Sequence, residues 1–219
     1  MTDEISVITT SMNYGRYLEE CIESVLGQRA SFPFKINHII MDGGSTDDTE
    51  QILKKYKDRI HYYVNSGEGQ TPALNHAMKI IEEEFPQTNF IGWLNADDYY
   101  NPIWLQASLS VLRKEAKNVA MTCGRITQVG ASPILQKKID ANERRENMTQ
   151  VLPYVRINRM LQGNSIIQPT VLIRMSAFKE LEKRYGFYFN EEYNFTQDLD
   201  LWHRFLANGF RIRRISARV

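Results

Sequence analysis

Three groups of acidic residues in this sequence could do chemistry. Asp97 and Asp98 directly follow the apolar stretch FIGWLNA. Asp42 precedes two glycines in MDGGSTDD, and Asp198 and Asp200 lie in TQDLDLW. Carboxylate oxygens are the ligands that Mg²⁺ and Mn²⁺ take, often together with substrate phosphates. A carboxylate can also serve as a general base. Cation binding and proton abstraction are therefore the two roles that these acids could fill.

Each group also has an interpretation without chemistry. An Asp–Asp pair after a strand is commonly a solvated turn. Asp42 with its two glycines is typical of an ordinary turn, and equally of a backbone that approaches a ligand closely. An acid at position 198 would be favoured by the dipole of a helix that begins there. His203 is a further candidate base, although a lone histidine in a helix is more often structural. These alternatives remain open at the level of the residues alone.

Strand and helix patterns alternate in the first half of the chain. Short β-branched or apolar runs predict buried strands, and amphipathic stretches after them predict helices. The expected strands are 5–11, 35–42, 59–65 and 90–97, and the expected helices are 15–28, 43–56, 71–85 and 101–115. The predicted helix starts are Ser45 or Thr46 as a cap, Thr71 before Pro72, and Asn101 before Pro102. This alternation predicts an α/β fold with a mostly parallel sheet and helices on both faces.

The expected sheet explains why the acids matter. Ligands of such sheets bind beyond the carboxyl ends of the strands, and the polar clusters TSMN, DGGSTDD, NSGEGQ and NADD all follow expected strands. The second half shows a strand at 119–130, which could form part of a hairpin, a polar loop with a short helix at 131–160, a strand leading into a helix at 169–178, and a helix at 198–210. We expect one domain over 1–219, with a first half at 1–115 and a second half at 116–219.

Composition excludes several classes of protein. The 219 residues carry a net charge of +1, which gives no general attraction to nucleic acid. Two cysteines predict reduced thiols rather than a disulfide framework. There is no signal-peptide pattern and no apolar run near the roughly 20 residues that span a bilayer. We therefore expect a cytoplasmic protein. Its basic end RIRRISARV is expected to be an edge strand, with peripheral contact at an anionic membrane face as the alternative.

In order along the chain, the motifs resemble those of glycosyltransferase family 2, whose members have the GT-A fold. The resemblance spans roughly residues 4–210. The stretches that carry it are ISVITTSMNYGRYLEECIESVLGQ, HIIMDGGSTDDTEQILKKY, GQTPALNHAMK, IGWLNADDYYNP, QPTVLIRMSAF and TQDLDLWHR. The DGGSTDDT and LNADD spellings are most similar to bacterial members that build surface polysaccharides. No QxxRW motif of processive synthases is present.

The resemblance implies that residues 1–115 form the nucleotide-sugar-binding half and residues 116–219 the acceptor-binding half, and it implies roles for particular residues. Thr10 and Asn13 would lie near the nucleotide base and ribose, Asp42 would contact the nucleoside, and Asn75 would be a polar residue on the donor side. NAD at 95–97 falls on the DXD motif, so that Asn95 would contact the donor and Asp97 would bind Mn²⁺ or Mg²⁺ with Asp98 as its neighbour. Asp198 matches the catalytic base. The departures from the family pattern are Asn95 at the first DXD position, Gly43 in place of Asp, Met12 in place of an aromatic residue, and Leu74 in place of Arg.

The function that this resemblance implies is inverting transfer of a sugar from a nucleotide diphosphate sugar, with UDP as the first expectation. The acceptor would be a hydroxyl of a glycan or lipid-linked glycan in bacterial polysaccharide synthesis. A sugar nucleotidyltransferase is the first alternative, but TTSMNYGRYL has one glycine and one arginine where that class usually has a richer loop. An inactive module that binds a sugar nucleotide or glycan is the second alternative. The acids at 97 and 198 argue against it.

Overall fold

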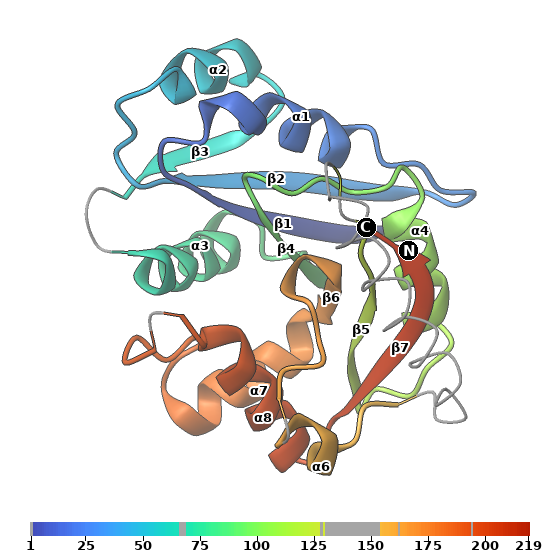
Figure 1. Ribbon diagram of the computed structural model, residues 1–219. Coiled ribbons are helices and arrows are strands. Elements are labelled where there is room, and N and C mark those ends of the chain that lie inside the picture. Colours follow the sequence, from blue (N-terminus) through green and yellow to red (C-terminus); the bar gives the residue numbers. More distant parts are fainter. Residues whose placement is uncertain (1, 66–68, 128, 130–153, 162, 194) are drawn as a thin grey trace.

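A seven-stranded sheet forms the centre of the protein (Figure 1). The structure, a computed structural model, describes residues 2–65, 69–127, 129, 154–161, 163–193 and 195–219. Across the sheet the strands follow the order β3-β2-β1-β4-β6-β5-β7. They are β1 Asp3–Ser11, β2 Phe34–Asp42, β3 His61–Val64, β4 Phe90–Asn95, β5 Val119–Arg125, β6 Val171–Arg174 and β7 Arg211–Arg218. Only β6 among them runs antiparallel to its neighbours. The predicted mostly parallel sheet is confirmed.

Helices cover both faces of this sheet, as the alternating pattern predicts (Figure 1). They are α1 Gly15–Leu26, α2 Thr49–Tyr56, α3 Gln70–Glu84, α4 Trp104–Leu112, α6 Ile157–Met160, α7 Met175–Tyr185 and α8 Gln197–Ala207, with a 3₁₀ turn at Gln168–Thr170. Consecutive strand residues explain how both faces are filled. Ile8 of β1 packs in a cluster with residues of α3, α7 and α8, whereas its neighbour Val7 packs with residues of α1 and α4. Successive side chains of a strand point to opposite faces, so a strand buried on both faces is mostly apolar rather than alternating.

Three predicted helix starts are wrong. Helix α2 begins at Thr49, not after Ser45 or Thr46, because both of those residues bond to the loop after β1. Helix α3 begins one residue before Thr71, at Gln70, and Gly69 precedes it with φ 87°, a left-handed conformation that glycine allows. Helix α4 begins at Trp104, two residues after Pro102, because the preceding residues form a separate turn.

The second half completes the sheet through pairings between distant segments. Strand β5 pairs with β6 and β7, so the hairpin considered for 119–130 does not form within the described residues. The basic C-terminal stretch is the edge strand β7, as predicted. Most of the polar loop predicted at 131–160 lies outside the described residues. Cys21 and Cys123 are both buried and do not form a disulfide. None of the described helices is both long and apolar enough to cross a bilayer.

The buried histidine His38, within β2, is expected to make the unfolding free energy depend on pH. His38 of β2 is 1% exposed, and its Nε2 lies 2.9 Å from Oγ1 of Thr9. Burial, followed by the charge of His61, lowers the pKa of His38 to about 3. The folded state therefore binds this proton less readily than the unfolded state, whose histidine has a pKa near 6.5. The stability that comes from keeping His38 neutral is present above pH 6.5 and is lost as the pH falls below it.

We expect wild-type protein to lose about 2 kcal/mol of unfolding free energy through His38 between pH 6.5 and pH 5, at about 1.4 kcal/mol per pH unit. His38→Gln keeps a polar atom near Thr9 but does not titrate, so its stability should depend less steeply on pH. Urea denaturation of both proteins across this range measures the two slopes. Parallel curves would show that His38 does not titrate in this window.

Candidate active site

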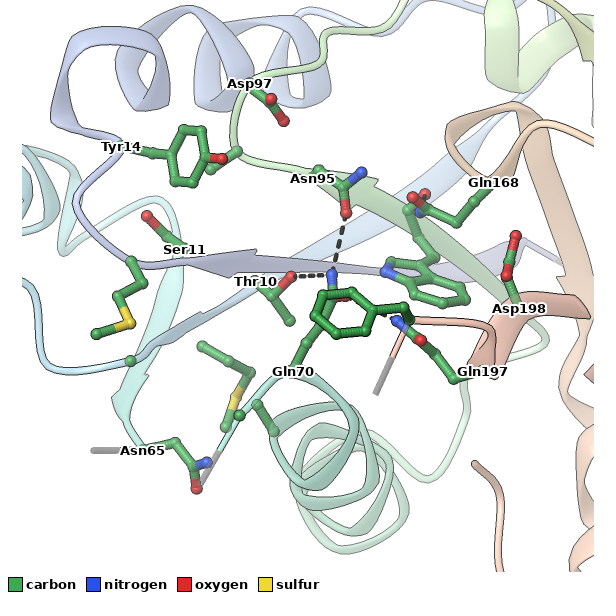
Figure 2. Close-up of a pocket in the computed structure, with 18 residues that line it drawn as sticks. Thr10, Ser11, Tyr14, Asn65, Gln70, Asn95, Asp97, Gln168, Gln197 and Asp198 are labelled. Atoms are coloured by element: carbon green, nitrogen blue, oxygen red, sulfur yellow. Dashed lines mark hydrogen bonds between the residues drawn. The ribbon is translucent and has the colours of Figure 1, made fainter. Parts of the chain in front are cut away.

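A cavity of about 820 Å³ opens at the carboxyl ends of β1, β2 and β4 (Figure 2). That volume is in the range of small-molecule and cofactor sites. The described residues that line it are Thr10, Ser11, Met12, Tyr14, Met41, Gly43, Asn65, Gly69, Gln70, Ala73, Trp93, Asn95, Ala96, Asp97, Gln168, Phe195, Gln197 and Asp198. They come from both halves of the chain, so the sheet must form before the cavity exists.

Strand register brings the predicted residues to this edge. In the parallel pairing of β1 with β4, Thr10 lies beside Asn95, and in the pairing of β1 with β2, Ser11 lies beside Asp42. Thr10 at the end of β1 and Asn95 at the end of β4 are both predicted for the donor site, and both line the cavity. The cavity therefore lies beyond the carboxyl ends of the strands, where ligands of such sheets are expected to bind.

The two adjacent aspartates after β4 have different environments. Asp97 is exposed and lines the cavity, and no described residue forms a hydrogen bond or ion pair with its carboxylate. Asp98 is not a lining residue, and its Oδ2 accepts a hydrogen bond of 3.3 Å from Nδ2 of Asn95. Burial and then the charge of Asp97 raise the pKa of Asp98 to about 6. Asp97 is thus the carboxylate of the pair that is open to a ligand, while Asp98 braces the turn.

A divalent cation would fit at Asp97. The carboxylate is unpaired among the described residues, it faces the cavity, and the neighbouring Asp98 adds negative charge. Nowhere in the described part of the chain do three His, Cys, Asp or Glu side chains gather closely enough to hold a metal. One carboxylate together with phosphate oxygens and water is a usual ligand set for Mg²⁺ bound to a nucleotide. The metal roles of Asp97 and Asp98 stay predictions.

Asp198 lines the same cavity from the first turn of α8. Its Oδ2 accepts a hydrogen bond of 2.8 Å from Nδ2 of Asn164, and its Oδ1 accepts one of 2.7 Å from the backbone N–H of Leu199. These two contacts hold the side chain at the cavity wall. His203, the other candidate base, does not line the cavity. In the view of Figure 2, Asp97 and Asp198 lie on different sides of the cavity, with Asn95 between them.

Two other predicted donor residues shape a turn next to the cavity rather than line it. Asn13 has φ 60°, and its Oδ1 accepts a hydrogen bond of 2.8 Å from the backbone N–H of Thr46. Asp42 is 6% exposed, and its two carboxylate oxygens accept hydrogen bonds from Oγ and the backbone N–H of Ser45 at 2.5 and 3.1 Å. These bonds tie the end of β1 to the glycine turn after β2. Contacts of Asn13 and Asp42 with a nucleoside stay predictions.

Asn75 on α3 also lies outside the cavity lining. Its Nδ2 donates to the backbone oxygen of Phe189 at 2.9 Å and to Glu191 at 2.8 Å, and its Oδ1 accepts from the backbone N–H of Phe189 at 2.9 Å. The side chain therefore fastens the segment that leads into α8 onto α3. Its predicted donor-side role is not tested by this placement.

Several cavity residues were not predicted from the sequence. Gln70 and Gln197 join the two halves of the cavity through side-chain hydrogen bonds. Asn65 is 8% exposed, its Oδ1 lies 3.0 Å from Nδ1 of His76, and its Nδ2 has no partner among the described residues. Phe195 is 95% exposed and lines the cavity just before α8. Asn65 and Gln70 belong to the polar cluster NSGEGQ after an expected strand, but a neutral side chain within such a cluster has no charge that distinguishes it.

Comparison with solved structures places this fold among glycosyltransferases of the GT-A type. TarS from Staphylococcus aureus aligns over 97% of this chain and 35% of its own, with a TM-score of 0.70 and 21% identity. A mannosyltransferase from Pyrobaculum calidifontis, solved with GDP-Man and Mn²⁺, aligns over 100% of this chain and 55% of its own, with a TM-score of 0.68 and 15% identity. At these identities the likeness establishes the fold.

The sequence profile described as Glycosyl transferase family 2 matches residues 6–182, and the chain belongs to this family. An uncharacterized glycosyltransferase of Rickettsia typhi is 28% identical over 204 residues, which cover 92% of this chain and 58% of the relative. A putative teichuronic acid biosynthesis glycosyltransferase of Bacillus subtilis is 32% identical over 143 residues, covering 64% of this chain and 53% of the relative. The chain spans about 58–60% of the length of the first two Rickettsia relatives.

Proposed function

We propose that this protein is an inverting glycosyltransferase that moves a sugar from a nucleoside diphosphate sugar to an acceptor hydroxyl. The observation that carries the proposal is a cavity at the carboxyl ends of parallel strands. It is lined by the carboxylate of Asp97, which no described residue pairs with, and by a second carboxylate at Asp198. Membership of glycosyl transferase family 2 supports the reaction class. The geometry offers a place for a diphosphate at one carboxylate and for a hydroxyl at the other.

Each carboxylate would have one task in this reaction. A divalent cation, Mn²⁺ or Mg²⁺, held by Asp97 would neutralise the charge of the leaving diphosphate when bound. The oxygen of the acceptor hydroxyl would form a bond to the anomeric carbon, and the bond from that carbon to the diphosphate oxygen would break. Asp198 would accept the proton that the hydroxyl loses in this step. A base in this position contributes roughly a hundred- to ten-thousand-fold to rate. Attack from the face opposite to the leaving group inverts the anomeric carbon.

The nucleoside would occupy the end of the cavity formed by β1 and β2. Thr10 and Asn95 would contact the donor directly, and Asn13, Asp42 and Asn75 would form its surroundings. UDP is the first candidate nucleotide, because solved structures of Staphylococcus aureus TarS contain UDP and UDP-GlcNAc. GDP is the second, since the Pyrobaculum mannosyltransferase was solved with GDP-Man.

The acceptor is proposed to be a growing or lipid-linked bacterial glycan. The name of the Bacillus subtilis relative, which refers to teichuronic acid biosynthesis, supports this class. A cytoplasmic location, where nucleotide sugars are made, would suit such a reaction, and contact with the inner membrane face would suit a lipid-linked acceptor. These assignments go with the proposal and depend on it.

A panel of nucleotide sugars tests the proposal. We expect one UDP- or GDP-sugar to raise the Tm in the presence of Mn²⁺, by an amount that grows with ligand concentration, and to have a much smaller effect with EDTA. At a hundredfold excess over Kd the stabilisation should be about 2.7 kcal/mol. If no nucleotide sugar stabilises the protein in the complete panel, the proposed donor class is wrong.

A second measurement separates the enzyme from the two alternatives. The enzyme should release UDP or GDP slowly from the stabilising donor in Mn²⁺, because water can replace the acceptor. An inactive binding module would be stabilised without any release. A sugar nucleotidyltransferase would instead bind a nucleoside triphosphate and release pyrophosphate in the presence of a sugar phosphate.

A further inference from the structure

Four side chains form a hydrogen-bonded chain that crosses the cavity wall from α8 to the turn after β4. Nε2 of Gln197 donates to Oε1 of Gln70 at 2.7 Å. Nε2 of Gln70 donates to Oδ1 of Asn95 at 3.2 Å, and also to Oγ1 of Thr10 at 2.9 Å. Nδ2 of Asn95 in turn donates to Oδ2 of Asp98 at 3.3 Å. Figure 2 draws the two bonds that Gln70 donates, at the centre of the cavity.

The hydrogen bonds that link these four side chains are all donated in the direction from Gln197 to Asp98, and Asp98 determines that direction. An ionised carboxylate only accepts hydrogen bonds, so Asn95 must turn its N–H₂ group toward Asp98. The oxygen of Asn95 then faces Gln70, which must donate to it, and the oxygen of Gln70 must accept from Gln197. One carboxylate thus sets the orientation of three amides. Bonds in such a sequence polarise and strengthen one another.

This arrangement accounts for the residue at the first position of the NAD motif. Asn95 donates to Asp98 and accepts from Gln70, which an amide can do and a carboxylate cannot. Aspartate at this position would set two carboxylates against each other at the 3.3 Å contact, beside the carboxylate of Asp97. Asparagine at position 95 therefore suits both neighbours, because it accepts from Gln70 and donates to Asp98.

The amide chain also connects the two carboxylates of the proposed reaction. Gln197 directly precedes Asp198 in the first turn of α8 and is 5% exposed, so its side chain anchors that turn. Asn95 is two residues before Asp97 and ends β4. Gln70 is the side chain that bonds to both. Gln70 therefore links the first turn of α8 to the end of β4, in addition to the packing of α8 in the core.

We propose that Gln70 is a positioning residue that sets Asp198 relative to Asp97 through Gln197 and Asn95, and that Asn95 is its required amide partner. This inference rests on the proposed function for its catalytic consequence. The proposed polarity of the chain, in contrast, has a consequence for stability that holds whatever the protein catalyses.

The first test replaces Gln70 with methionine, which keeps the length of the side chain and removes all three bonds. We expect kcat to fall about 10- to 100-fold, while the Kd for UDP with Mn²⁺ rises by a smaller factor, because Thr10 and Asn95 lose a neighbour but stay in place on their strands. Turnover is measured with UDP-glucose or UDP-N-acetylglucosamine, whichever stabilises the wild type more. Gln70→Glu, which keeps the acceptor for Gln197 but loses both donated bonds, should show a loss of the same kind.

A matched control is offered by Gln28, which lies outside the cavity. It is 8% exposed, and its side chain also forms three hydrogen bonds between elements, donating to the backbone oxygens of Ser24 and Asn101 and accepting from the backbone N–H of Leu105. Gln28→Met should lower the Tm but leave kcat of the folded protein near the wild-type value. Equal kcat for the Gln70 and Gln28 variants would overturn the positioning role.

The second test uses Asn95→Asp, which restores the common DXD spelling. We expect this change to lower the Tm and the turnover, because it removes the donor to Asp98. Adding Asp98→Asn to it exchanges donor and acceptor across the same contact, so the double variant should recover a large part of the lost Tm. A Tm that is unchanged in Asn95→Asp, or not recovered in the double variant, would overturn the proposed polarity.

The two tests distinguish failure of this inference from failure of the proposed function. If the wild type turns over no nucleotide sugar, the proposed function is wrong, and the Tm measurements on Asn95 and Asp98 still decide the polarity. If the wild type is active and Gln70→Met retains wild-type kcat, the proposed function stands and the positioning role is wrong.

Discussion

Asp198→Asn is expected to reduce sugar transfer by at least about a hundredfold while the donor still binds with nearly wild-type affinity. Asparagine has almost the same shape and can keep the contact that Asp198 accepts from Asn164, but it cannot take a proton from the acceptor hydroxyl. The loss should therefore appear in kcat and not in the Kd for the donor. Titration with UDP and steady-state turnover measure the two quantities separately.

Asp200→Asn provides the control for this variant. Asp200 is on the same turn of α8, but its Oδ2 accepts a hydrogen bond of 2.8 Å from Nε of the buried Arg204 and it does not line the cavity. Its replacement should lower the Tm by weakening a buried ion pair, while turnover by the folded protein is retained. Substantial turnover by Asp198→Asn would reject Asp198 as the base.

Asp97→Asn is the second variant with a large expected effect, and here donor binding itself should weaken. The carboxylate has no partner among the described residues and faces the cavity, so its charge is available to a cation. We expect the Mn²⁺-dependent part of donor affinity to fall at least about a hundredfold, which is about 2.7 kcal/mol. Calorimetric titration with UDP in Mn²⁺ and in EDTA measures this part directly.

The wild type in EDTA is the reference for that experiment, because it should resemble Asp97→Asn in Mn²⁺. Asp98→Asn gives a second comparison. Asp98 is engaged with Asn95 and does not line the cavity, so its replacement should weaken the Mn²⁺ dependence less than Asp97→Asn does. If Asp98→Asn has the larger effect, the cation ligand of the pair is Asp98. Equal Mn²⁺ dependence in wild type and Asp97→Asn would exclude a metal role for Asp97.

Much of the fold could be predicted because its first half consists of local patterns. The stretches that form β1, β2 and β4 are rich in β-branched and apolar residues, as is typical of strands buried on both faces. The pairing of β6 between β4 and β5 could not be predicted in the same way. These strands are distant in sequence, and their contacts leave no mark in the pattern of either strand.

The residues of the candidate site also differ in whether local sequence patterns could predict them. Asp97 and Asp198 could be selected because an acid at a strand end or helix start has an evident chemical use, and both line the cavity. Gln70 and Gln197 could not, since a neutral amide is informative only through its partners. The partners are 60 residues apart for Thr10 and Gln70, and 127 residues apart for Gln70 and Gln197. Helix α3 also begins two residues before Pro72, the predicted first helical residue, so the sequence pattern leaves Gln70 outside the helix.

The alternation of side chains along β4 determines which residues of this strand line the cavity and restricts how the strand can vary. Trp93 and Asn95 line the cavity, while Leu94 between them belongs to the apolar cluster on the opposite face. An insertion or deletion of one residue in β4 would send Leu94 into the cavity and Asn95 into the core. Insertions and deletions of one residue in β4 are therefore expected to be rejected in evolution, because they would prevent folding. Substitutions around Phe195, which is 95% exposed just before α8, would instead alter the cavity lining without shifting the register of the sheet, so variation is expected to accumulate there.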